Sequence, residues 1–404
     1  MSYASTLYEQ GAVWDTPTCL VLIICALGSL ASSWEYGDTL SELDKESQAS
    51  TFSSTRSNDI QRAKVYFSAA EQRLGYAIGQ PRILPIQCLC LASVYHMYTL
   101  NPLAALHMFH AAGTAVQISL STTYSTPHST LSGDLSSSSN IIRRLFWTCF
   151  KSEREILSEV PLGHLAVAHL DLSEQYPSPP EDKESLVSGN EWEIIQENSW
   201  YYYLAEMAIR RIIDSIVDTM YPEDSDTFLD PKYPIHQLIP IAAEFQRQLD
   251  SWHGCLPPSL AFPLSPGPVA TELMYYLQFG YHRVSELPCR PFLYRAIHNP
   301  NSVSNDVANL AEQGLAHISS YLIASNQMHW HHGRWIQIRR ELGGACLLLA
   351  ASKSGLQMPL NWYAGVARLH ETLRYWCSKS SQLTSYLELL SAVDKFFTGT
   401  VVET

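Results

Sequence analysis

Hydrophobic side chains recur at intervals of three and four residues along most of the chain, which is the spacing of one buried face of an α-helix. Between Leu84 and Leu100 this face consists of Ile86, Leu89, Cys90, Val94, Met97 and Tyr98. Pro85 fits the first turn of that helix, because a proline there gives up no hydrogen bond. A second helix is predicted to begin at Pro102, directly after Asn101.

The same spacing predicts further helices toward the C-terminus. Asn140 is predicted to cap the helix of "IIRRLFWTCFKSEREILSE", because its side-chain oxygen can accept an N–H of the first turn. Later helices are predicted at Ser199–Met220, Pro240–Trp252, Val269–Glu286, Val303–Ser325, Arg334–Ser352 and Ala364–Lys379. No run alternates Val, Ile and Thr around Asn-Gly or Asp-Gly turns, so few strands are expected.

Three polar segments, 39–59, 119–140 and 176–197, are predicted to be flexible loops. Residues 119–140 include 13 Ser or Thr among 22, a composition that permits phosphorylation. None of the three is long enough to separate independent domains. We therefore predict one all-α domain over 1–404, made of packed antiparallel helices, solenoid-like in part. A smaller C-terminal lobe could follow Pro291.

Composition limits the partners. Hydrophobic residues make up 46% of the 404 residues, which excludes disorder over the whole length. The net charge is −13, only 16% of residues are charged, and the arginine doublets at 143–144, 210–211 and 339–340 are isolated. This balance argues against broad phosphate contacts, which need clustered Lys and Arg. No DNA-binding residue is predicted.

The nine cysteines are odd in number and mostly lie in apolar stretches, which is typical of reduced, buried thiols in an intracellular protein. No secretory signal is expected, because the first basic residue is Lys45. The apolar run Cys19–Leu27 is too short to span a membrane. We expect a soluble protein without a membrane contact.

No metal site or cofactor is predicted. Cys88 and Cys90 diverge by about 200° around a helix and are interpreted as core thiols. Two histidine groups lack a carboxylate nearby in sequence: His96, His107 and His110, and then His329, His331 and His332. Nor does the chain contain a Gly-x-Ser-x-Gly elbow, a P-loop or a dinucleotide-binding glycine motif, so no catalytic residue is predicted.

Several ionisable residues inside apolar helices are candidates for a pocket or a regulatory role. They are Lys151, Glu153, Glu155, Glu206, Arg210, Arg211 and, further along the chain, His329. The simpler interpretation is a solvated face with intrahelical pairs, such as Arg210 with Asp214 at i, i+4.

A series of segments then resembles the regulatory domain, or middle homology region, of fungal zinc-cluster transcription factors. The segments are "CLVLIICALGSLA" at 19–31, "QCLCLASVYHMYTLNPLAALHMFHAA" at 87–112, "RRLFWTCFKSEREILSEVPL" at 143–162, "YPSPP" at 176–180, "SWYYYLAEMAIRRI" at 199–212, "AAEFQRQLDSWHGCLPPSLAF" at 242–262 and "RPFLYRAIH" at 290–298. Their order and spacing match from about residue 15 to about residue 350.

The resemblance implies an all-helical fold, a nuclear location and transcriptional control, often of a biosynthetic gene cluster. That family reads DNA through an N-terminal cluster of six cysteines and two zinc ions, a pattern that this sequence lacks, so no zinc or DNA contact is carried over. DNA would be reached only indirectly, through a transcription factor or coregulator, unless the sequence is a truncated gene model. A small-molecule effector is a further possible partner.

An enzyme on the same helical scaffold, cyclase-like or isomerase-like in a secondary-metabolite pathway, is the alternative. Its motivation is the set of aromatic and ionisable residues that includes Trp200, Tyr201, Tyr202, Tyr203 and His329. Aromatic runs at helical spacing more often belong to a core than to an active site.

Overall fold

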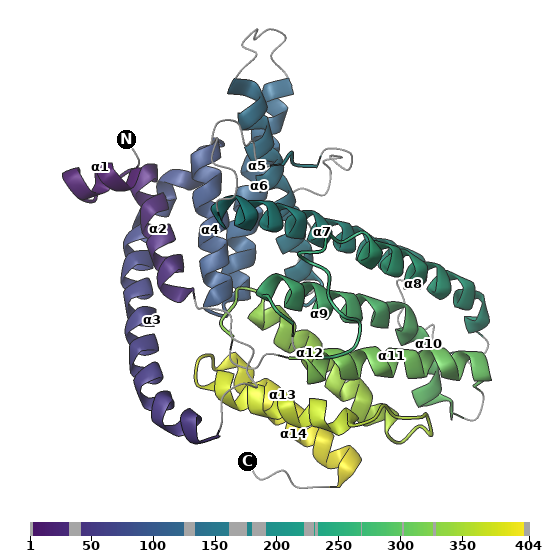
Figure 1. Cartoon of the computed structure of the whole chain (residues 1–404). Helices are drawn as coiled ribbons and strands as arrows, with labels where there is room; N and C mark the ends of the chain where they lie inside the picture. The colour runs from purple at the N-terminus through teal and green to yellow at the C-terminus, as the bar shows by residue number, and fades with distance from the viewer. Residues whose placement is uncertain are drawn as a thin grey trace. The chain divides into compact units, whose positions relative to one another are not determined.

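The computed structural model describes residues 3–31, 42–124, 134–160, 176–179, 191–221, 230, 233–267, 269–300, 303–325 and 329–399. Within these ranges every regular element is a helix and no β-strand occurs (Figure 1). The predicted all-α fold class is therefore confirmed. The contacts between helices divide the chain into two compact units, and each is described by itself.

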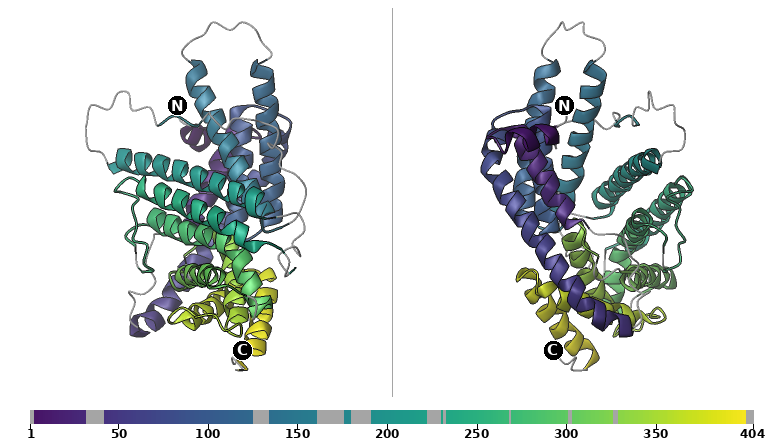
Figure 2. Two further views of the ribbon diagram at one scale, coloured as in Figure 1. Left: turned by 90° about the vertical axis from the view of Figure 1, so that its right-hand side faces the viewer. Right: turned by 60° about the vertical axis from the view of Figure 1, so that its left-hand side comes forward.

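Unit 1 takes its described residues from Met1–Ser33, Asp38–Ser178 and His329–Gln337. Its helices are α1 (Tyr3–Gln10), α2 (Thr16–Leu30), α3 (Glu42–Ile78), α4 (Ile83–Tyr98), α5 (Pro102–Tyr124) and α6 (Asp134–Leu157). Helix α4 packs on α2, α5 and α6, and Figure 2 shows α4, α5 and α6 running side by side. The short segment His329–Gln337 therefore joins a unit that otherwise ends at Ser178.

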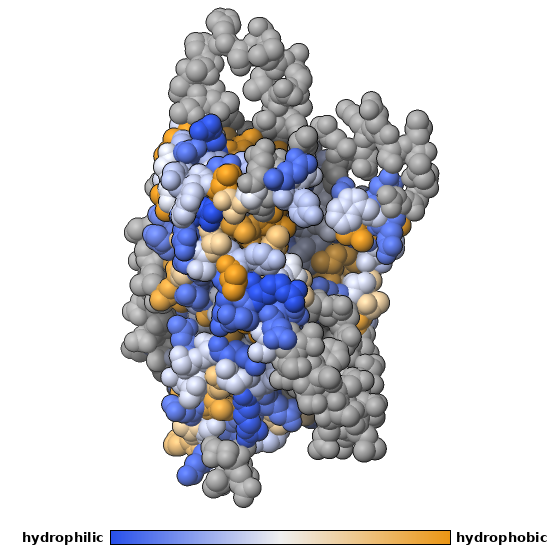
Figure 3. Space-filling view, turned by 90° about the vertical axis from the view of Figure 1, so that its left-hand side faces the viewer, coloured by the Kyte–Doolittle hydropathy of each residue, from blue (hydrophilic) through white to orange (hydrophobic). Residues whose placement is uncertain are grey.

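Helix α2 begins where the sequence supplies a cap. The Asp15 carboxylate accepts the Thr18 N–H at 2.9 Å. The helix buries one stripe of apolar residues against α3 and α4, namely Cys19, Leu22, Ile23, Ala26 and Leu30. Its opposite face includes Ile24, which is 51% exposed. Hydrophobic and hydrophilic side chains are interspersed on the molecular face in Figure 3.

Helix α5 has a segment, Pro102–Ser121, that by length and hydropathy could cross a membrane. A third of that segment is buried inside the structure, and α5 packs against both α4 and α6. Core helices of soluble proteins pass the same test of length and hydropathy, so α5 is weak evidence for a membrane span. Asn101 precedes the helix, and its side chain accepts the Ala104 N–H at 3.4 Å.

Unit 2 takes its described residues from Pro179–Met328 and Ile338–Thr404. Its elements are α7 (Glu191–Met220), η2 (Ile235–Leu238), α8 (Ile239–Gly254), α9 (Glu272–Glu286), η3 (Leu287–Cys289), α10 (Arg290–His298), α11 (Asn305–Ile323), most of α12 (Arg334–Ala351), α13 (Trp362–Cys377) and α14 (Gln382–Thr398). Gly344 of α12 lies against α11. A Cβ at Gly344 would clash with the Tyr321 hydroxyl and lie 2.9 Å from Ile318 Cγ2, so only glycine permits this approach.

Two local predictions were wrong. The predicted loop 39–59 is helical from Glu42 onward, because α3 runs unbroken through this polar stretch. No Gly or Pro occurs between Glu42 and Leu74, and Ser and Thr alone do not break a helix. Asn140 is not a cap, because α6 already begins at Asp134. Its amide instead binds Ser178, whose N–H it accepts at 2.8 Å.

Helices also extend into the other two predicted loops. Helices α5 and α6 occupy both ends of 119–140, and 125–133 lie outside the described residues. Helix α7 begins at Glu191 within 176–197, and 180–190 are likewise not described. The number of domains stays a prediction. One boundary between the two compact units lies at residue 178, and none lies near Pro291. Helix α14 was not predicted at all.

Candidate regulatory site

The segment His329–Arg334, called here the histidine segment, is the part of unit 1 that is most distant in sequence from the rest. The Trp330 indole donates a hydrogen bond to the Tyr98 carbonyl at 3.0 Å, at the end of α4. Because Trp330 is only 7% exposed, this bond lies in a largely dry environment. The segment is thus tied to the junction between α4 and α5.

Aromatic rings cluster around this anchor. The rings of His331 and His332 have centroids 3.9 Å apart, and the Tyr98 ring lies 6.4 Å and 5.9 Å from them. His329, a candidate from the sequence, lies 6.2 Å from His331 in a stacked arrangement. Three histidines and one tyrosine therefore share one small volume.

A buried arginine closes the segment. Arg334 has no exposed surface, and its Nε and Nη2 donate to the His329 carbonyl at 3.2 Å and 2.9 Å. A guanidinium held by two bonds to one carbonyl fixes the backbone between residues 329 and 334. The backbone that leads into the first turn of α12 is therefore held in place.

The ionisation of His331 follows from these neighbours. Burial is the main reason that the pKa of His331 lies well below its usual value. His332 and His329 lower it further, as do the positive charges of Arg334 and Lys151. His331 is therefore a neutral imidazole near pH 7.

A neutral ring can accept a hydrogen bond, and the His331 Nδ1 accepts the Gly333 N–H at 2.9 Å. Protonation of that nitrogen would break the bond and place a cation beside Arg334. Near neutral pH the His331 ring of the histidine segment is therefore an uncharged hydrogen-bond acceptor. In the ranges that the structure describes, no group of three or more His, Cys, Asp or Glu is placed to hold a metal ion.

Two sequence candidates bear on the histidine segment and others do not. His329 belongs to the segment, and the charge of Lys151 on α6 lowers the pKa of His331 slightly, after the larger effects of burial and the neighbouring histidines and Arg334. Glu153, on the same helix, has no exposed surface, and its Oε1 lies 3.3 Å from His110 Nδ1 on α5. Glu155 is half-buried on α6.

The His110–Glu153 contact was missed because only carboxylates near the histidines in sequence were considered. The partner comes from the next helix, and no local spacing signals it. The other two histidines of that group lie apart: His107 is exposed, and the His96 ring packs edge-on against Phe67 at 5.1 Å.

The remaining candidates lie in unit 2, on α7. Arg210 is buried and pairs with Asp214 at 2.8 Å, as the i, i+4 spacing predicts. Arg211 is exposed and Glu206 is half-buried. The three charges of α7 and the histidine segment are therefore described in different units.

Unit 2 also holds a buried ion cluster that the sequence analysis did not single out. Glu286, with no exposed surface, lies 3.0 Å from Arg283 Nη1 and also binds Arg290. Burial alone would raise the pKa of Glu286, but the charges of Arg290 and Arg283 outweigh it and hold the pKa below the usual value. The i−3 and i+4 spacing of the two arginines was a signal that could have found this cluster.

The two arginines are not equivalent. Burial and the charge of Arg290 together lower the pKa of Arg283 despite the opposing effect of Glu286. Burial alone would lower the pKa of Arg290, but the charge of Glu286 outweighs burial, and the pKa of Arg290 is raised. Glu286 is thus chiefly the counter-ion of Arg290.

Histidines form two further buried contacts in unit 2. His282 Nδ1 lies 3.1 Å from His317 Nδ1, so one ring donates and the other accepts. Burial, followed by the charge of His317, lowers the pKa of His282 to about 4. Separately, the Asp394 carboxylate binds His370 Nε2 at 3.1 Å and accepts the Tyr363 hydroxyl at 2.9 Å.

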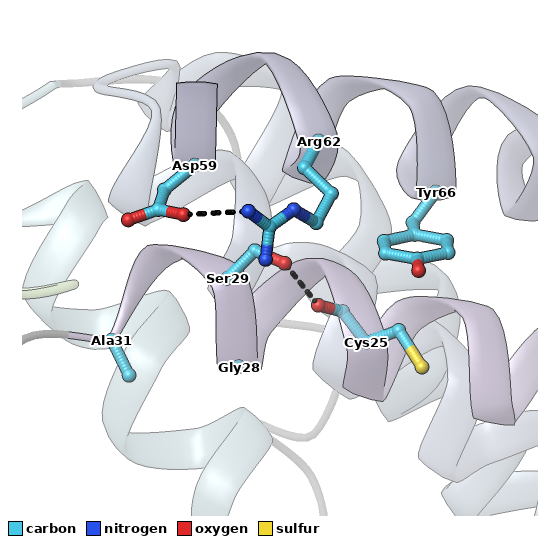
Figure 4. Close-up of a pocket in the computed structure, with 7 residues that line it drawn as sticks. All are labelled: Cys25, Gly28, Ser29, Ala31, Asp59, Arg62 and Tyr66. Atoms are coloured by element: carbon cyan, nitrogen blue, oxygen red, sulfur yellow. Dashed lines mark hydrogen bonds and ion pairs between the residues drawn. The ribbon is translucent and has the colours of Figure 1, made fainter. Parts of the chain in front are cut away.

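An open pocket of about 370 Å³ lies between α2 and α3 of unit 1 (Figure 4). Its lining consists of Cys25, Gly28, Ser29, Ala31, Asp59, Arg62 and Tyr66. Arg62 and Asp59 form an ion pair at 3.1 Å, with the Arg62 side chain 59% exposed. The pocket is open to solvent, and its lining is more polar than apolar.

Comparison with known proteins gives one result. The family model of the fungal specific transcription factor domain matches residues 7–254, more than half of the chain. The resemblance seen in the sequence extended to about residue 350, so "RPFLYRAIH" at 290–298 lies outside the match. No curated protein and no solved structure matches.

Proposed function

Because the chain belongs to the family of the fungal specific transcription factor domain, we propose that it regulates transcription in the nucleus and controls the genes of a biosynthetic pathway. The observation that carries this proposal is the family match over 7–254, which spans α1 to α8. A regulatory domain of this kind acts on transcription and not on a substrate, so we propose no catalytic role.

Charge supports an indirect route to DNA. The chain has a net charge of −13, and Arg210 of the arginine doublet on α7 is already neutralised by Asp214. Affinity for DNA depends on cations that remain available to phosphates. We therefore propose that a transcription factor or coregulator brings this chain to a promoter.

Deletion of the gene in the organism that encodes it tests the proposal. We expect a coordinated fall in the transcripts of one set of biosynthetic enzymes and a nuclear signal from the tagged protein. Precipitation of the tagged protein from nuclear extract should recover a DNA-binding factor. Unchanged transcripts after deletion would refute the function, and direct binding of the purified chain to promoter DNA would refute the indirect route.

We propose the pocket between α2 and α3 as the place for a small-molecule effector. Gly28 lines it, and a Cβ there would meet no atom within 4 Å, so Gly28→Leu should fill the pocket without disturbing the helices. Gly75→Leu on α3 is the matched control, because that position is also open and does not line the pocket. A pathway metabolite should raise the melting temperature of the wild type and of Gly75→Leu, but not of Gly28→Leu. Equal shifts in all three would place the effector elsewhere.

The enzyme alternative has less support. Trp200–Tyr203 on α7 are half-buried, and the rings of Trp200 and Tyr201 are 4.9 Å apart, as in ordinary helix packing. His370 and Asp394, which could form an acid–base pair, are 2% and 0% exposed, so a substrate would not reach them. Conversion of a pathway intermediate by the purified protein, followed by mass spectrometry, would revive this alternative.

A further inference from the structure

Helix α14 of unit 2 has apolar side chains on two of its faces. One face packs on α13, beside which α14 runs in Figure 1, and buries Leu383 and Leu390. The same face buries Asp394, whose carboxylate binds Tyr363 and His370 of α13. The other face also carries large apolar side chains, but these are exposed.

The exposed face follows a regular spacing. It consists of Ser385, Leu389, Ala392 and Phe396, which are spaced by four, three and four residues and are all exposed. At about 100° per residue, the four positions fall within about 60° of arc and form one line along the helix, called here the α14 stripe. Leu389 is 50% exposed and Phe396 is 79% exposed. An aromatic ring this exposed gains hydrophobic free energy only when a partner covers it.

Two charges of opposite sign flank the α14 stripe on one side. Glu388 directly precedes Leu389, Lys395 directly precedes Phe396, and both charged residues are exposed. The stripe and its charges therefore form a heptad pattern. The large side chains occupy position a, the small ones occupy position d, and the charges occupy position g.

We propose that the α14 stripe is an interface between two copies of this chain, in which the two α14 helices pack antiparallel about a two-fold axis. In an antiparallel pair, the a side chains of one helix face the d side chains of the other. Leu389 then faces the partner's Ala392. The same axis places Phe396 opposite the partner's Ser385.

The sizes of the side chains favour this arrangement. Each layer of the antiparallel pair combines one large side chain with one small one, so the large side chain fills the space that the small one leaves. A parallel pair would instead place Phe396 against Phe396 and Ala392 against Ala392, which gives alternately crowded and empty layers. The stripe is thus complementary in shape to an inverted copy of itself, as a two-fold interface requires.

The charges favour the same arrangement. Side chains on a helix lean toward its N-terminus, so the g residues of two antiparallel helices approach each other. Glu388 would meet the partner's Lys395, and the two-fold axis would repeat this pair on the other side. Because both residues are exposed, the two ion pairs add little affinity and chiefly determine the orientation of the helices.

The length of α14 limits the strength of the interface. The helix has 17 residues and is about 25 Å long. One pair of helices of this length buries less than the roughly 1,600 Å² of a standard interface, so we expect a reversible dimer that depends on protein concentration. The inference concerns unit 2 alone and does not depend on the proposed function.

Sedimentation equilibrium of the full chain tests the proposal. A reducing agent is present, so that the free cysteines cannot link two copies. The average mass should rise from that of a monomer to that of a dimer as the concentration increases. Phe396→Asp should raise the dissociation constant by more than about 100-fold, because the interface would contain the substitution twice. Leu360→Asp is the matched control, because Leu360 is 88% exposed, lies outside α14 and should leave the dimer unchanged.

A charge exchange tests the orientation of the helices. Glu388→Lys places two lysines opposite each other on both sides of the axis, which should raise the dissociation constant by about tenfold. Adding Lys395→Glu to Glu388→Lys restores opposite charges and should return the dissociation constant to within about threefold of the wild type. The melting temperatures of the variants show that each is folded.

Three results would overturn the proposal. A chain that stays monomeric at every concentration has no such interface. A dimer that Phe396→Asp leaves intact uses another surface, and a dimer without rescue by the charge exchange does not pair α14 in the antiparallel register. If the chain is monomeric and Phe396→Asp removes a protein that the wild type precipitates from nuclear extract, a different protein occupies the α14 stripe.

Discussion

The cores of the two units bury polar groups of different kinds. Between α2, α4 and α6, unit 1 buries the thiols of Cys19, Cys88, Cys90 and Cys149, and the last two lie 3.6 Å apart. Around α9, unit 2 buries the Glu286 carboxylate between two arginines and a histidine pair beside them. Loss of a contact between neutral thiols lowers the free energy of unfolding only slightly. A buried charge that has lost its counter-ion lowers it by several kcal/mol. Substitutions should therefore affect the two cores very unequally.

The largest effect is expected for Glu286→Gln. Glutamine keeps the shape but leaves Arg283 and Arg290 without their shared counter-ion, which should lower the free energy of unfolding by about 3–5 kcal/mol. Urea unfolding with hydrogen exchange on α9 measures this. Glu388→Gln is the matched control, because Glu388 is exposed and should change stability by less than about 0.5 kcal/mol. A cost below about 1 kcal/mol for Glu286→Gln would show that the cluster does not depend on its charge.

An intermediate effect is expected from acid. The pKa of His282 is about 4 in the folded protein against an ordinary value of 6.5, so the unfolded chain binds more protons between these values. Stability of unit 2 should be fully present above pH 6.5 and fall as the pH drops toward 4, by up to about 3 kcal/mol. His317 faces His282 and has a lowered pKa of its own, so it adds to this loss, and His253 also disfavours the charged ring.

His282→Asn checks that assignment. The amide can still bind His317 but does not titrate, so the slope of stability against pH between 6.5 and 4 should flatten. The slope is compared and not the absolute stability, because the substitution itself changes packing. An unchanged slope would assign the acid sensitivity to other groups.

The smallest effect is expected for Cys149→Ala in unit 1. The substitution removes one buried sulfur and its contact with Cys90, which should cost about 1 kcal/mol. Cys25→Ala, at a half-buried position, should cost less. Thermal unfolding under reducing conditions measures both. A loss as large as that of Glu286→Gln would remove the distinction between the two cores.

Helix ends were predictable where the sequence supplies a local signal. Pro102 after Asn101 marks the start of α5, and the predicted end at Met220 is the end of α7. The start of α3 at Glu42 was not predictable from polarity, since polar residues without Gly or Pro fit a helix as well as a loop. Local spacing thus determines most helices but not the polar ones.

The candidate site shows the same limit more strongly. Spacing predicted that Cys88 and Cys90 diverge, and both are buried free thiols as expected, but nothing local identifies Cys149 as the neighbour of Cys90. Lys151 and His329 were both candidates, yet only the fold brings Lys151 within electrostatic range of the histidine segment. Such contacts depend on tertiary packing, which a single sequence does not reveal.

The bond between Trp330 and Tyr98 joins residues 232 positions apart. During synthesis on the ribosome, α1 to α6 emerge long before their last partner, and most of unit 2 is made in between. Unit 1 is therefore completed late, and a fragment cut at the end of the family match, Gly254, would lack the histidine segment altogether. A fragment that ends where the family match ends would therefore contain an incomplete unit 1.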